Sequence, residues 1–191
     1  MSFLKWKSFA LIASTSLLAA CGSGGGSEGA GQIDAARHLI AKYENADITS
    51  VMPTKGTATY HGVAAYAYAQ DLSNASYKEL AALQNLSPQE VDKFIRATSD
   101  VALTADFEAA SVKGKLNNFQ TTAGGLDGSV NVNAKIKGSS FDGTLNGTVG
   151  GAAASGNLAG AFIGEGAEAM AGALGAKLDG TQYIGLFGAE K

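Results

Sequence analysis

The second half of the chain alternates hydrophobic and polar residues with a period of two. In the clearest run every second residue is apolar, namely Val130, Val132, Ala134 and Ile136, and the residues between them are Asn or Lys. Similar alternation occurs over 101–107, 112–117 and 141–149. A period of two indicates strands with one buried and one wet face, which is typical of antiparallel sheets. The pattern therefore predicts a mainly β fold.

Turn residues divide this half of the chain into short strands. We expect eight of them, at about 57–68, 101–109, 111–119, 128–137, 140–149, 156–164, 167–176 and 182–188. Asp127-Gly128 and Asp179-Gly180 are turn signals, and the second is a good type I′ hairpin sequence. Short gaps and an even number of strands predict an eight-stranded antiparallel up-and-down β-barrel, because closure removes exposed edges. Such a barrel is either filled by its own side chains or holds one small ligand.

One segment, residues 70–99, interrupts the strands between the first and the second. It predicts two helices, Ser76–Gln84 and Ser87–Thr98, and the second opens with the capping box Ser87-Pro88-Gln89-Glu90. A hairpin would need only a few residues here. This helical insertion has two interpretations: it carries part of the function, or it only plugs one end of the barrel.

The first 20 residues have the features of a secretory signal. Lys5 and Lys7 precede the apolar run 9–18, which is too short to span a bilayer. Leu18-Ala19-Ala20-Cys21 follows and resembles the bacterial lipobox, in which the cysteine is acylated and the chain is cut before it. Several acyl chains would hold the protein on a membrane. The alternative is a buried free cysteine beside an ordinary cleavage site.

The sequence therefore divides into four parts. Residues 1–20 are a lipoprotein signal peptide, and 21–32 are the lipidated Cys21 with a flexible Gly/Ser tether. Residues 33–54 form a short helical or irregular stem, and 55–191 form the barrel domain with its insertion. Gly22 is not the Asp that resembles an inner-membrane retention signal, so the outer membrane is favoured.

Charge and composition exclude several classes of function. The full chain has a formal net charge of -3, and loss of two of its 14 basic residues with the signal leaves -5. A chain this acidic does not seek nucleic acid by itself. Cys21 is the single cysteine, so neither a disulfide framework nor a cysteine metal site can form.

Catalytic motifs are missing from the sequence. The chain has two histidines, His38 and His61, and His61 lies on the face of its strand opposite Tyr60, which predicts that it points to solvent. No nucleophile elbow and no metal-type cluster occurs. Glu165 and Glu168 could pair as acids, but their place in a hairpin favours a structural role. We therefore predict no enzyme, no metal and no cofactor.

Aromatic residues supply the candidate binding site. Tyr66 and Tyr68 end the first predicted strand, and Tyr77 and Phe94 lie in the insertion that follows directly. All four could meet at one barrel mouth and offer apolar area with polar tips to a partner protein or a planar ligand. Packing of the insertion on the barrel end explains the same residues without a ligand.

Three segments together resemble the C-terminal barrel of transferrin-binding protein B and factor H binding protein. They are Gly56-Thr-Ala-Thr-Tyr60-His-Gly62, then Leu158-Ala-Gly160-Ala-Phe162-Ile-Gly164 with Ala167-Glu168 and Gly172, and the ending Ile184-Gly-Leu-Phe-Gly188-Ala-Glu-Lys191. The resemblance covers 55–69 and 100–191, and it implies an eight-stranded barrel lipoprotein on the surface of a Gram-negative cell. The glycines fit such a fold, because a Gly in a strand lets backbones approach. The chain lacks the second lobe of the large family members, and its insertion is unlike a plain hairpin, so binding of transferrin or factor H does not carry over.

The sequence therefore predicts a monomeric, surface-anchored binding module that captures a host or environmental protein, in iron or haem acquisition or as capture of a host factor. It would contact the membrane through its lipid and bind no nucleic acid. Some relatives bind haem, so haem remains a candidate ligand. The alternatives are a small-ligand barrel with the insertion as a lid, and a structural envelope lipoprotein.

Overall fold

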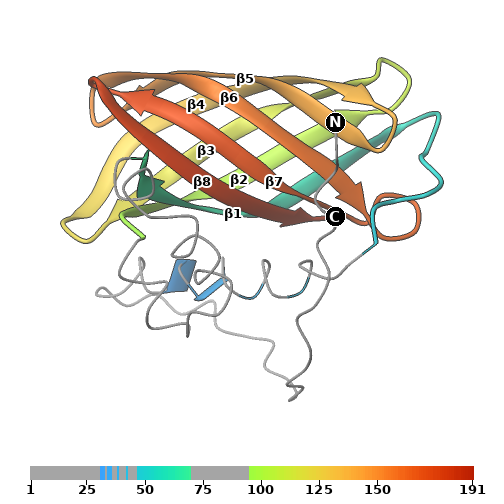
Figure 1. Ribbon diagram of the computed structural model, residues 1–191, viewed down its shortest axis with the longest axis horizontal. Coiled ribbons are helices and arrows are strands. Elements are labelled where there is room, and N and C mark those ends of the chain that lie inside the picture. Colours follow the sequence, from blue (N-terminus) through green and yellow to red (C-terminus); the bar gives the residue numbers. More distant parts are fainter. Residues whose placement is uncertain (1–30, 33, 36–37, 39–41, 43–46, 70–94) are drawn as a thin grey trace.

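A computed structural model describes residues 31–32, 34–35, 38, 42, 47–69 and 95–191. Its core is a closed barrel in which each strand pairs with its neighbour in the sequence and β1 pairs with β8, all antiparallel (Figure 1). The strands are β1 (Thr57–Tyr68), β2 (Ala97–Asp106), β3 (Ser111–Thr121), β4 (Gly124–Lys137), β5 (Ser140–Val149), β6 (Ala152–Ile163), β7 (Ala169–Leu178) and β8 (Thr181–Glu190). The mainly β, eight-stranded antiparallel barrel is thus confirmed.

The predicted boundaries of β2 were wrong at both ends. The strand begins at Ala97, so the last two residues of the predicted helix Ser87–Thr98 are strand instead. It ends at Asp106, whose carboxylate accepts a hydrogen bond of 2.9 Å from the Ala109 amide and so holds the turn to β3. Residues 70–94 of the predicted helical insertion lie outside the described residues, as do residues 33, 36–37, 39–41 and 43–46 of the predicted stem.

The predicted turn at Asp127-Gly128 was also wrong, because β4 runs through it. The turn lies earlier, at residues 122–123, where the Thr121 hydroxyl accepts a hydrogen bond from the Ala123 amide. The β3–β4 register shifts between Asn117 and Phe119, and Asn118 there has a φ of 50°. Asp127 and Gly128 therefore lie opposite Asn118 at a β-bulge within the sheet, and not in a turn between two strands.

The second turn signal behaves as predicted. Asp179 and Gly180 both have positive φ, 45° and 82°, and join Leu178 of β7 to Thr181 of β8. Positive φ at both central residues defines the type I′ turn, whose twist matches that of the flanking strands.

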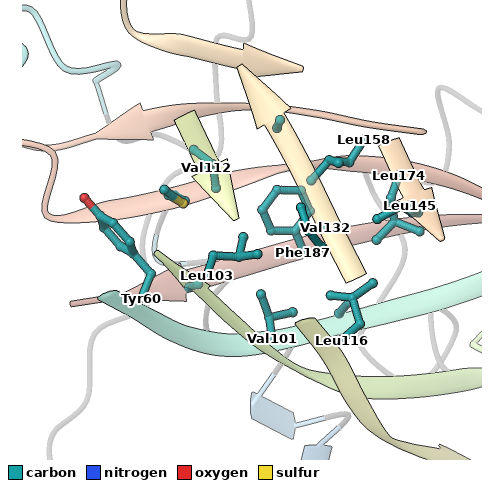
Figure 2. Packing of buried hydrophobic residues seen from close by; sticks show 14 of the residues in the cluster. Tyr60, Val101, Leu103, Val112, Leu116, Val132, Leu145, Leu158, Leu174 and Phe187 are labelled. Carbon is teal, nitrogen blue, oxygen red and sulfur yellow. The ribbon is translucent and has the colours of Figure 1, made fainter. Parts of the chain in front are cut away.

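Alternation sorts the side chains between the barrel interior and the solvent as the sequence predicts. Val130, Val132 and Ala134 of β4 are buried, and the Asn and Lys residues between them are exposed. Figure 2 shows such side chains from several strands meeting inside the barrel. His61, on the outer face of β1, is exposed as expected.

Glycines at inward positions let neighbouring strands approach closely. A Cβ added to Gly114 would collide with the Ala102 carbonyl oxygen, and one added to Gly147 with the Ser129 carbonyl oxygen. The backbone therefore occupies space that any other residue would need for its side chain.

One end of the barrel, here called the closed end, holds the turns β2–β3, β4–β5 and β6–β7. Phe162 lies fully buried there, with ring centroids 5.3 Å from Phe141, 5.7 Å from Phe107 and 6.2 Å from Tyr60. The Tyr60 hydroxyl donates a 2.7 Å hydrogen bond to the Ala167 carbonyl. Aromatic rings thus fill this end of the interior.

A segment before β1, residues 47–52, straps the closed end from outside. Ile48 forms a bridge with Ile163, and the Thr49 amide donates to the Phe162 carbonyl at 2.9 Å. The buried Thr49 hydroxyl donates to the Gly164 carbonyl at 2.7 Å. These contacts attach the strap to the end of β6.

Gln32 anchors the chain that precedes the strap to the outer wall of β2 and β3. Its side-chain oxygen accepts a 2.5 Å hydrogen bond from the Thr98 hydroxyl, and its amide donates to the Asp100 carboxylate at 2.8 Å. Asn118 donates to the same carboxylate at 3.0 Å. In the part of the chain described, no helix combines the length and the apolarity needed to cross a membrane.

Candidate binding site at the open end

The opposite end of the barrel, here called the open end, contains a cavity of about 290 Å³. The last residues of β1, β3, β5 and β7 and the first residues of the strands that follow them meet at this end. The described residues around the cavity come from all eight strands and the segments beside them: Tyr66, Tyr68, Arg96, Ala97, Leu116, Phe119, Thr121, Thr122, Ala123, Leu126, Val130, Leu145, Val149, Ala154, Ser155, Ala176, Leu178 and Tyr183. The barrel is therefore filled at one end and hollow at the other.

Tyr66 and Phe119 form the aromatic side of the cavity. Alternation along β1 turns Tyr66 inward, and its ring centroid lies 6.4 Å from that of Phe119. The Tyr66 hydroxyl shares a 2.8 Å hydrogen bond with the buried Ser99 hydroxyl. Burial raises the pKa of Tyr66 far above its usual range, although the hydrogen bond with Ser99 opposes that shift. Tyr66 is thus a neutral, fixed part of the wall.

Tyr68, Tyr183 and Arg96 form the polar rim. Tyr68 and Tyr183 are register partners on β1 and β8, and their ring centroids are 5.2 Å apart. The guanidinium carbon of Arg96 lies 5.6 Å from the Tyr68 ring centroid, within the range of a cation–π interaction. Burial, followed by the charge and hydrogen bond of Tyr68, raises the pKa of Tyr183.

The remaining wall is aliphatic. Leu145, Val149, Ala154, Ala176 and Leu178 come from β5, β6 and β7 and face the aromatic side across the cavity. Among the described lining residues Arg96 is the only one with a charged side chain. The cavity thus offers an apolar body with a cationic rim.

Two of the four aromatic residues predicted for the site line this cavity. Tyr66 lies in its wall and Tyr68 on its rim. Tyr77 and Phe94 lie outside the described residues, and so does Cys21, the predicted lipidation site. Tyr66 and Tyr68 lie at the same barrel mouth because they are two residues apart at the end of β1, so both side chains face inward.

Sequence reasoning missed Tyr183, Arg96 and Phe119. The type I′ turn at 179–180 fixes the β7–β8 register and so could have placed Tyr183 opposite Ala176, facing inward. Phe119 lies beyond the bulge at Asn118, which reverses the inward alternation of β3, so its direction could not be counted from Leu116. Arg96 carried no signal, because it lay within a predicted helix.

Among the described residues, the His, Cys, Asp and Glu side chains form no group of three or more that could hold a metal ion. Glu165 and Glu168 are both exposed in the β6–β7 connection, at the closed end and away from the cavity.

Comparison with known protein families decides the relationship. A family model described as the C-lobe and N-lobe β-barrels of Tf-binding protein B matches residues 52–191, which cover the strap residue Met52 and all eight strands. The chain belongs to this family. The resemblance predicted from the sequence is therefore confirmed for the transferrin-binding protein B barrels.

Solved structures similar to the chain include three of transferrin-binding protein B. A tryptophan-to-alanine mutant from Haemophilus parasuis is 20% identical, with a TM-score of 0.48, over 75% of this chain and 28% of that one. A phenylalanine-to-alanine mutant from Actinobacillus pleuropneumoniae is 19% identical, with a TM-score of 0.46, over 75% and 65%. The isotype 1 protein from Neisseria meningitidis is 18% identical, with a TM-score of 0.45, over 76% and 33%.

The chain thus spans between 28% and 65% of the length of these relatives. No curated protein sequence matches it.

Proposed function

We propose that this protein is a non-catalytic binding module that a lipid on Cys21 holds at the outer surface of a Gram-negative cell. Its open end captures a host or environmental protein, in iron or haem acquisition or to recruit a host factor. Membership of the transferrin-binding protein B barrel family is the observation that carries this proposal. These relatives are named transferrin-binding proteins, so an iron-carrying protein is the first partner to test.

The composition of the open end supports its role as the capture surface. Tyrosine and arginine are the residue types that protein interfaces enrich, and Tyr68, Tyr183 and Arg96 stand together on the rim. Leu126, on the same rim, is an exposed large hydrophobic residue. A partner that covered this end would bury apolar surface around a fixed cationic group.

Capture is tested with a chain that begins at Gly22, because every described contact lies within residues 31–191. The immobilised protein is incubated with iron-loaded transferrin, with iron-free transferrin and with whole serum, and retained proteins are titrated. We expect saturable binding of one protein that falls at least tenfold in Tyr68→Ala and Tyr183→Ala. Matched variants at the closed end, Glu108→Ala and Glu165→Ala, should bind as well as the parent chain.

Two results would contradict capture by the open end. If no protein is retained saturably, the family's protein-binding role does not extend to this chain. If the closed-end variants lose binding while the rim variants keep it, the capture surface lies elsewhere on the barrel. Circular dichroism of each variant checks that the barrel is still folded.

The anchor is tested in cells. Wild-type protein should take up labelled palmitate and fractionate with the outer membrane, and protease added to intact cells should remove it. Cys21→Ser should lose the label and leave the membrane fraction, whereas the neighbouring variant Ser23→Ala should change neither. A labelled, membrane-bound Cys21→Ser protein would refute lipidation at this residue.

A further inference from the structure

We propose that the open-end cavity binds one medium-length aliphatic carboxylate, with the hydrocarbon chain inside the barrel and the carboxylate at Arg96. This site goes beyond protein capture: it shares Arg96 with the capture rim but holds the hydrocarbon inside the barrel, and it needs no macromolecular partner. The shared chemistry is a straight acyl chain, which can come from a free fatty acid or from the lipid on Cys21.

The wall suits a flexible hydrocarbon chain. Leu116, Val130, Leu145, Val149 and Leu178 supply aliphatic surface from four different strands. The Tyr66 hydroxyl is already engaged with Ser99, so it does not demand a polar group from the ligand. Burying an alkyl chain here removes apolar surface from water on both partners.

The rim suits a carboxylate. Arg96 is the only charged side chain among the described lining residues. A guanidinium has five N–H donors in a planar fork, so it can hold a carboxylate in addition to the contacts that it makes within the chain. Its position over Tyr68 keeps the charge at the mouth, while the aliphatic wall lies below.

The volume sets the length of the chain. A cavity of about 290 Å³ has room for roughly ten groups the size of a water molecule or a methylene. Each additional buried methylene should raise affinity about fourfold until the cavity is full. We therefore expect affinity to climb from hexanoate to decanoate and then to level off.

The first experiment is calorimetric titration of the chain from Gly22 with this series, at ligand concentrations below micelle formation, with native mass spectrometry to count bound molecules. We expect one molecule per chain and a plateau near ten carbons. Binding that increases with chain length without a plateau, or with several molecules per chain, would overturn an enclosed site.

Matched substitutions test the location. Ala176 faces the cavity from β7, and Ala173 is exposed on the same strand. Ala176→Phe should reduce decanoate affinity at least tenfold, whereas Ala173→Phe should leave it unchanged. Ala154→Leu, on β6, repeats the test should Ala176→Phe fail to fold. Unchanged affinity in a folded variant with a narrowed cavity would refute the site.

The head group is tested by comparing decanoate with decanol. Arg96→Gln should weaken decanoate about tenfold and leave decanol unchanged, because a hydrogen bond to a charged group is the interaction removed. Lys177→Gln, an exposed cation on β7, is the control and should affect neither. Equal weakening of both ligands, or none, would overturn the role of Arg96.

The source of the acyl chain is tested with protein isolated from membranes. Gln32 fixes the chain beside the open end, and Cys21 precedes it by 11 residues, which span at most about 40 Å. If the anchor's own chain fills the cavity, lipidated protein takes up no decanoate and Cys21→Ser protein binds it fully. Equal uptake assigns the site to a free fatty acid. Failure of uptake by both forms refutes the site and leaves protein capture untouched.

Discussion

The two ends of this barrel are built from the same eight strands and differ in what fills them. At the closed end Phe162 packs against three other aromatic rings, and the strap at 47–52 covers the outside. At the open end Tyr66 and Phe119 form one wall of a cavity, and aliphatic side chains line the other walls without filling it. Closure of the sheet therefore does not determine whether the interior is filled. The sizes of the inward-facing side chains at each end of the barrel determine it.

This difference in packing suggests a division of roles, in which the closed end contributes stability and the open end provides the binding site. Rings in contact on all sides contribute dispersion and burial, whereas side chains beside a void lack partner atoms on one side. A protein that keeps such a void forgoes part of its stability there. Substitutions at matched positions of the two ends can measure this division.

The largest expected difference comes from truncating one aromatic ring at each end. Phe162→Ala should reduce the free energy of unfolding by about 4 kcal/mol, because it removes a fully enclosed side chain. Phe119→Ala should cost about 2 kcal/mol, because part of its surface already faces the cavity. Urea unfolding measures both, and equal losses would contradict the comparison.

Alkaline pH offers a second measurement, through Tyr60 at the closed end and Tyr66 at the open end. Burial raises the pKa of Tyr60 to about 12 and that of Tyr66 higher still, against about 10 in an unfolded chain. The folded state therefore keeps protons that the unfolded state releases, so stability is constant below about pH 9 and falls as pH rises from about 10 to 12.

The expected loss from Tyr60 alone is about 2 to 3 kcal/mol over that range. Denaturant unfolding at pH 9 and pH 11.5 measures it, and Tyr60→Phe and Tyr66→Phe should each reduce the dependence on pH. Thr59→Val, at an exposed position of β1, is the control and should leave the dependence as it is. A stability that rises with pH in this range would show that neither tyrosine is buried as described.

Local patterns predicted much of this fold because strand periodicity and turn chemistry act over a few residues. The alternation at 130–137 and the type I′ turn at 179–180 both appear as expected. Prediction failed at bulges and at the start of β2. Asp127-Gly128 has turn chemistry but lies within β4, where these two residues face Asn118 alone at a bulge. Thr98 has a helical context, but it is the register partner of Gln120 and hydrogen-bonds to Gln32.

The candidate site was less predictable, since it depends on volumes summed across the barrel. Tyr66 and Tyr68 follow from their place at the end of one inward-facing strand. The cavity itself arises where small residues of adjacent strands, such as Ala154 and Ala176, line the same part of the interior, which depends on the register of β6 with β7. No single strand carries that information.

Enlarging a buried side chain, like truncating one, should destabilise the closed end more than the open end. Ala134→Leu, near the closed end, should cost about 1–3 kcal/mol, because Ala134 is buried and closely packed beside Gly143. Ala176→Leu, at the open end, should change stability by less than about 1 kcal/mol, because the added atoms enter the cavity. Thermal unfolding of both variants measures this, and equal destabilisation would mean that the cavity is filled.

The smallest expected change in stability comes from a substitution in the strap. Thr49→Val keeps the shape of the side chain and the backbone bond to Phe162, and removes only the hydroxyl that donates to the Gly164 carbonyl. Loss of one buried hydrogen bond should cost about 1 kcal/mol in urea unfolding. Thr144→Val, at an exposed position of β5, should cost less than about 0.5 kcal/mol. If both variants match the parent chain, the strap does not hold the closed end, and packing around Phe162 alone accounts for the difference between the two ends.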